Sequence, residues 1–193
     1  MSGKEVTFKE SRIIATTLLL VGMGFLMSVI PEGNLYLFLF NLFLAIIACV
    51  LFYTFWRKLK FQSKRYFSLL SYVMINTMAI YFAIPLLRLY FLTFTFWFGI
   101  GMLLIMIILP YLYAKEIAFG VQKPYKSKLG KIFLIYTVLV MVFGISAYMG
   151  SLYHANADAL VLAVVAFLMS LLFFFLAPIM LIKPEEMDEL MKK

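Results

Sequence analysis

Six long apolar runs alternate with short polar segments along the chain. Each run is 18 to 25 residues long and contains no Asp, Glu, Lys, Arg or His. A helix needs about 20 apolar residues to cross a bilayer, whereas the strands of a membrane barrel would alternate polar and apolar residues over about 10 positions. The pattern therefore predicts an all-α integral membrane protein. Its six transmembrane helices are expected at 13–30, 35–56, 66–87, 89–113, 132–153 and 159–182.

The basic residues gather in alternate connections between these runs. Of the 17 Lys and Arg, only Arg88 falls in the connections that follow the first, third and fifth runs. Positively charged short loops stay in the cytoplasm. The sequence thus predicts a multi-pass protein of the cell (plasma) membrane with both termini cytoplasmic. Its three helical hairpins would form one bundle and a single domain over 1–193, with short cytoplasmic tails. Arg88 is expected to be an anchor at the outer surface.

Composition agrees with a lipid environment, since 65% of the residues are hydrophobic and 13% are charged. Soluble domains are about one quarter charged. The net charge of +8 would suggest nucleic acid in a soluble protein, but here the cytoplasmic loops account for it and no RNA-recognition motif accompanies it. We expect attraction to anionic lipid or to an acidic partner, and no nucleic acid. The residues expected to make these contacts are Arg57, Lys58, Lys60, Lys64, Arg65, Lys123, Lys126 and Lys128.

Residues for catalysis or metal binding are scarce. Charges inside a membrane are costly and mark transport paths or proton relays, and the six runs contain none. The one His, His154, could hold a cation together with Asp158, or serve Ser151 as a catalytic base, but turn and helix-cap roles fit both residues better. The sequence therefore predicts no metal, no cofactor and no enzyme.

Neutral polar residues inside the runs leave two interpretations open. Several lie in the half of the membrane that the topology makes the outer one. One interpretation is an outward-facing ligand pocket, and the other is hydrogen bonding between helices. The pocket would be lined by Asn41, Asn76, Thr93, Trp97 and Tyr148.

Both ends of the chain carry signs of helix capping. Thr7 and Glu10 have the spacing of a capping box. Pro184 and the acidic residues after it are typical of the start of a short amphipathic helix.

Three classes of function fit these observations. The first is a non-enzymatic accessory, regulatory or immunity-type membrane subunit that works with a protein partner. The second is a small-molecule or lipid-binding transport component with the outward-facing pocket. A lipid-modifying enzyme ranks last, because the spaced aspartates of such enzymes are missing.

Overall fold

The computed structural model describes residues 5–153 and 159–192, without the side chains of residues 147, 148, 150–153, 191 and 192. The described residues form helices and no strands. The long helices are α1 (Ile13–Val29), α2 (Leu35–Leu59), α3 (Ser63–Leu89), α4 (Phe94–Leu112), α6 (Lys128–Tyr153) and α7 (Ala159–Leu176). The short ones are α5 (Ala114–Gln122), α8 (Pro184–Lys192) and the 3-10 turns η1 (Pro124–Lys126) and η2 (Ala177–Leu181).

Five helices are long and apolar enough to cross a membrane: α2, α3, α4, α6, and α7 together with η2. The remaining long helix, α1, is apolar but has only 17 residues. The prediction of an α-helical, multi-pass membrane protein is therefore confirmed at this level.

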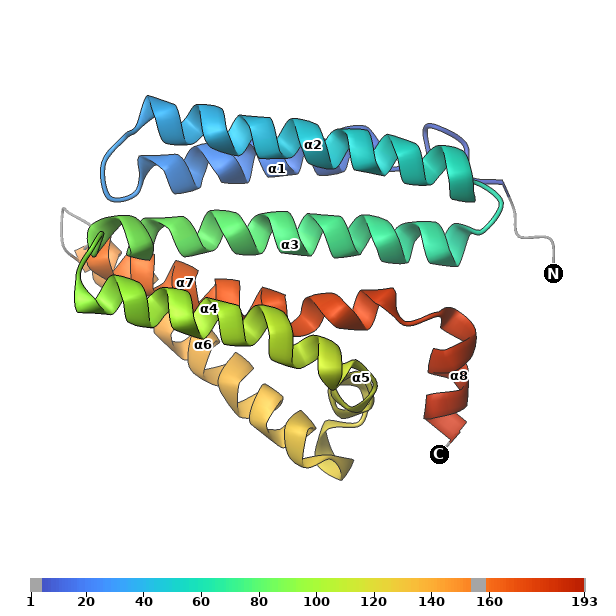
Figure 1. Cartoon of the computed structure of the whole chain (residues 1–193). Coiled ribbons are helices and arrows are strands. Elements are labelled where there is room, and N and C mark those ends of the chain that lie inside the picture. The colour runs from blue at the N-terminus through green and yellow to red at the C-terminus, as the bar shows by residue number, and fades with distance from the viewer. Residues whose placement is uncertain (1–4, 154–158, 193) are drawn as a thin grey trace.

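Helix α3 lies at the centre of the arrangement (Figure 1). Helices α1 and α2 pack on one side of it and α7 on the other, while α4 and α6 pack on α7. The buried side chains accordingly form two clusters. One joins α1, α2 and α3 around Leu20, Phe52 and Tyr66, and the other joins α3, α4 and α7 around Ala79 and Phe167.

Charged residues end the apolar runs without ending the helices. Helix α3 continues through Pro85 to Leu89, so Arg88 lies in its last turn and is not the sole residue between two helices. The turn between α3 and α4 instead occupies residues 90–93. Thr93 caps α4, where its hydroxyl accepts a hydrogen bond from the amide of Phe96 (3.4 Å). The guanidinium of Arg88 donates to the carbonyl of Glu32 (2.6 Å), which ties the turn before α2 to the end of α3.

The capping box forms, but it closes a turn and not the start of α1. The amide of Thr7 donates to the carboxylate of Glu10 (3.1 Å) and the amide of Glu10 to the hydroxyl of Thr7 (3.4 Å), while α1 begins only at Ile13. This turn lies against the end of α2, where the indole of Trp56 donates to the carbonyl of Val6 (2.9 Å). The predicted helix after Pro184 is confirmed as α8.

Two glycines set the tight connection between α5 and α6. A Cβ added at Gly130 would lie 2.4 Å from the carbonyl oxygen of Gly120 and 2.7 Å from the Cα of Pro124. Both neighbours are backbone atoms, so they cannot swing aside as a side chain could. The approach of α5 to α6 therefore requires the absence of a side chain at this position.

We predict that Gly130→Ala lowers the stability of the protein in detergent by at least 1–3 kcal/mol, roughly the cost of overpacking. Gly101→Ala is the matched control, because a Cβ there meets no atom within 4 Å and alanine favours a helix. Thermal melting of both variants, followed by light scattering, checks the difference. Equal melting temperatures for the two variants would contradict the close backbone contact.

Candidate functional site

The charged groups gather at one end of the helices, which we call the basic end. It comprises the N-terminal segment, the end of α2, the start of α3 and their connection, α5 with η1 and the start of α6, and α8 with the residues just before it (toward the right in Figure 1). Two ion pairs fasten its parts. Lys60 binds Glu5 (2.8 Å) and Lys115 binds Glu186 (2.9 Å). Because both pairs are exposed, solvent screens them and they add little to stability.

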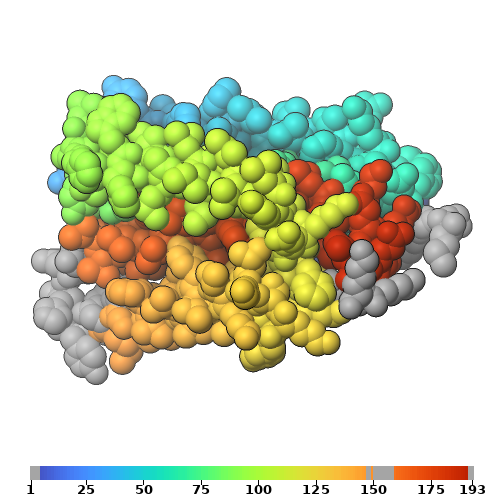
Figure 2. All heavy atoms as spheres, turned by 60° about the horizontal axis from the view of Figure 1, so that its bottom comes forward, coloured from blue at the N-terminus to red at the C-terminus, as the bar shows by residue number. Residues whose placement is uncertain are grey.

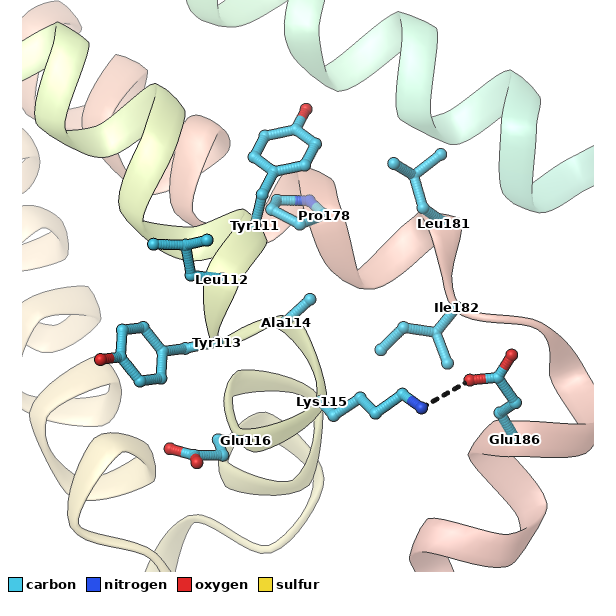
Figure 3. Close-up of a pocket in the computed structure, with 10 residues that line it drawn as sticks. All are labelled: Tyr111, Leu112, Tyr113, Ala114, Lys115, Glu116, Pro178, Leu181, Ile182 and Glu186. Carbon is cyan, nitrogen blue, oxygen red and sulfur yellow. Dashed lines mark ion pairs between the residues drawn. The ribbon is translucent and has the colours of Figure 1, made fainter.

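A hollow of about 420 Å³ lies where α4, α5, η2 and α8 meet (Figure 3). Tyr111 and Pro178 form its apolar side, and Lys115 reaches across it from α5 to Glu186 on α8. The neighbouring ammonium lowers the pKa of the Glu186 carboxyl, first through the hydrogen bond and then through its charge. The Glu186 carboxylate therefore stays ionised to a lower pH than an unpaired glutamate, and its ion pair links α8 to α5.

Helix α3 holds the chain that leads into α8. The guanidinium of Arg65 donates to the carbonyl of Leu181 (2.8 Å), and the hydroxyl of Ser68 donates to the carbonyl of Met180. The last carbonyls of a helix have no partner within it, and in an apolar surrounding an unpaired carbonyl is costly. These two side chains thus stabilise the end of η2. Sequence reasoning missed this role, since nothing in the local sequence links residues so far apart.

Two further hollows open at the basic end. One, of about 650 Å³, lies between the start of α3 and α8, and both cations and acids line it: Lys64, Arg65, Lys183, Glu185 and Asp188. The other, of about 510 Å³, lies between α5, α8 and the start of α6, and its charged lining is Lys115, Glu116, Lys126 and Lys128. Helix α8 borders each of these three hollows.

The predicted basic contacts divide into two groups. Lys60 is paired with Glu5, Arg65 is bound to a carbonyl, and Lys123 lies over the ring of Phe119 (5.2 Å to its centre). These three cations already have structural roles. The others are exposed and can meet lipid or a partner: Arg57, Lys58, Lys64, Lys126 and Lys128.

Among the residues predicted to line an outer pocket, Asn41 is fully buried between helices. Its carboxamide nitrogen donates to the backbone carbonyl of Gly24 in α1 (2.9 Å). The backbone carbonyl of Asn41 accepts a hydrogen bond from the hydroxyl of Tyr81 in α3 (2.7 Å). A Cβ at Gly24 would lie only 3.0 Å from the Cβ of Asn41. Asn41 therefore lies at the junction of three closely packed helices.

Three of the other predicted pocket residues have different surroundings. Asn76 donates to the carbonyl of Tyr72 in its own helix (2.8 Å), Thr93 caps α4, and Trp97 is 60% exposed on the outer surface of α4. The side chain of Tyr148 lies outside the described residues. The hollows described above are lined by other residues, so the outward-facing pocket stays a prediction.

No group of three or more His, Cys, Asp or Glu that could hold a metal ion occurs among the described residues. His154 and Asp158 lie outside them, as does the side chain of Ser151.

No protein-family model, curated protein or solved structure matches this chain. Its class therefore follows from its own helices: it is an α-helical membrane protein of the multi-pass kind.

We predict that Asn41→Ala lowers the stability of the detergent-solubilised protein by about 1 kcal/mol, as expected for a hydrogen bond between membrane helices. Asn76→Ala should cost less, because its carboxamide bonds within its own helix. Chemical unfolding of both variants in mixed micelles compares the two. A larger loss for Asn76→Ala would show that the junction at Asn41 is not the stronger contact.

Proposed function

We propose that this chain is a six-helix accessory subunit of the plasma membrane, of a regulatory or immunity type, which binds a protein partner through its basic end. Both termini are cytoplasmic in this proposal. Helix α1 is the sixth span, and its 17 residues reach about 25 Å, near the lower limit for crossing.

The orientation is supported by the positions of the cations. Every Lys and Arg whose side chain is described belongs to the basic end, except Arg88 at the opposite end. Because short cytoplasmic loops are enriched in Lys and Arg, the basic end is the cytoplasmic one. In the described part of the chain, the opposite end consists of tight turns, such as the five residues between α1 and α2.

The observation that carries the proposed function is the make-up of the basic end. Helices α5 and α8 lie outside the membrane-spanning set, are joined by an exposed ion pair, and border open hollows. These are surfaces that a cytoplasmic protein, or the cytoplasmic part of a membrane protein, can contact. An outward-facing solute pocket has less support, because Asn41 is enclosed between helices and Trp97 faces outward.

The orientation predicts a labelling pattern in a Cys49→Ser background. Gly33→Cys should react with a membrane-impermeant maleimide in intact cells, because position 33 lies in an exposed outer turn. Gln62→Cys and Tyr125→Cys should react only after the membrane is permeabilised. Labelling of position 62 in intact cells would contradict cytoplasmic placement of the basic end.

A partner at the basic end predicts site-dependent photo-crosslinking in cells. A photoreactive phenylalanine analogue replaces Tyr125 in η1, at the basic end. In the matched control it replaces Tyr36 in the first turn of α2, at the other end of the molecule. These side chains are 80% and 85% exposed, so both can accept the analogue without disturbing a core. We expect one discrete protein adduct from position 125 and none from position 36. Equal adducts from both positions, or an adduct from position 36 alone, would contradict the proposal.

A further inference from the structure

An apolar wedge opens between α4, α6 and α7. Its volume is about 100 Å³, and no polar surface lines it. Leu171 and Leu172 of α7 form the buried floor, while Met106 of α4 and Ile132 of α6 form walls. In Figure 2, α7 is visible between α4 and α6, so this face of the molecule does not close over α7.

The polar side chain that lines this wedge, Tyr136, already has a hydrogen-bond partner. The hydroxyl of Tyr136 donates to the carbonyl of Leu168 (2.7 Å), which ties α6 to α7. The rings of Phe133 and Phe175 stack with 6.0 Å between their centres and bridge the same two helices. The wedge therefore has no group that would hold water, and its walls suit hydrocarbon.

A cation, Lys128, lies on the same face of α6 as the wedge, one turn nearer the basic end. Lys128, Ile132 and Tyr136 are spaced four residues apart, so they lie one above the other on the helix. Lys128 is exposed and, with Lys126, lines the hollow of about 510 Å³ at the basic end. Within the described part of the chain, no carboxylate forms an ion pair with either lysine. Glu116 and the paired Lys115 are the other charged groups of that hollow.

We propose that this face is a binding site for one anionic phospholipid of the cytoplasmic leaflet. One acyl chain lies in the wedge, and the phosphate lies against Lys126 and Lys128. The spacing fits such a molecule, since Ile132 lies only about 6 Å along the helix from Lys128, with the cations at the aqueous end and the apolar walls below them. The excess of cations over Glu116 favours a negatively charged headgroup over a zwitterionic one.

A partner helix is a weaker candidate for the wedge. Helices pack closely in membranes where small residues let their backbones approach. The wedge is instead bordered by the large side chains of Met106, Ile132 and Phe133. A thin, conformationally adaptable acyl chain fits between such side chains more readily than a helix does.

The test uses the full chain in detergent, with dioleoyl phosphatidylglycerol and dioleoyl phosphatidylcholine as probes. Native mass spectrometry measures the apparent Kd of the first bound lipid. Lys126→Gln combined with Lys128→Gln should weaken binding of phosphatidylglycerol about thirtyfold, as expected for two cations near an anionic headgroup. Binding of phosphatidylcholine should weaken much less, because its choline group offsets the charge of its phosphate. The matched control is Arg57→Gln with Lys58→Gln, two exposed cations of α2 away from the wedge, and it should leave both affinities near wild type.

A second variant tests the wedge itself. Ile132→Trp adds bulk at a wall residue that is 63% exposed, so the fold should tolerate it, and it should weaken the binding of both lipids. Met106→Trp fills the wedge from α4 and should act in the same way, with melting temperatures confirming that both variants are folded. Equal weakening of phosphatidylglycerol binding by the Lys126/Lys128 variant and the Arg57/Lys58 control would reduce the effect to general attraction at the basic end and overturn the proposal. Unchanged lipid affinity in both folded tryptophan variants would overturn it as well.

Discussion

The arrangement depends on the burial of α3 between two groups of helices. Tyr66, Leu70 and Tyr81 belong to the cluster shared with α1 and α2, whereas Ala79 and Ala83 belong to the cluster shared with α4 and α7. Since lipid tails are as apolar as leucine, hydrophobicity alone cannot draw membrane helices together, and close packing with hydrogen bonds must do so. α3 meets this requirement because it combines aromatic, small and hydroxyl-bearing residues. No other described long helix contacts both groups to the same degree.

Tyrosine and asparagine side chains supply the polar ties between these helices. Tyr66 donates to the carbonyl of Ser11 (2.7 Å), Tyr81 to that of Asn41 (2.7 Å) and Tyr136 to that of Leu168 (2.7 Å). Each acceptor is a backbone carbonyl, which has two lone pairs and can accept a second bond. The aromatic ring fills space between helices, and its hydroxyl reaches a carbonyl of a neighbouring helix or, at Ser11, of the turn before α1. Residues that composition alone would assign to interfaces or lipid contact thus specify which helices pack together.

The sequence predicted the helical membrane class and the approximate spans because both follow from the length of charge-free runs. Helix ends were predicted less well. Charge marks where the chain leaves the lipid, whereas the helix itself ends where a cap such as Thr93 forms, so α3 continues past Pro85 and α6 begins at Lys128. The contacts of Asn41 with Gly24 and of Arg65 with Leu181 could not be predicted, because rotation about each helix axis decides them. An apolar run does not encode that rotation when nearly every face of it is apolar.

The two ends of the molecule differ in how their backbone groups are satisfied, and this difference bears on function. At the end opposite the basic one, Arg88 binds the carbonyl of Glu32 and ties the turn before α2 to the end of α3. At the basic end, Arg65 and Ser68 bind the carbonyls of η2 and thereby direct the chain outward into α8. The side chains of Arg65 and Ser68 thus hydrogen-bond to backbone carbonyls. The acids of α8 instead face Lys115 and the surrounding hollows. The proposed protein partner and the proposed lipid headgroup would therefore both contact the basic end of the molecule.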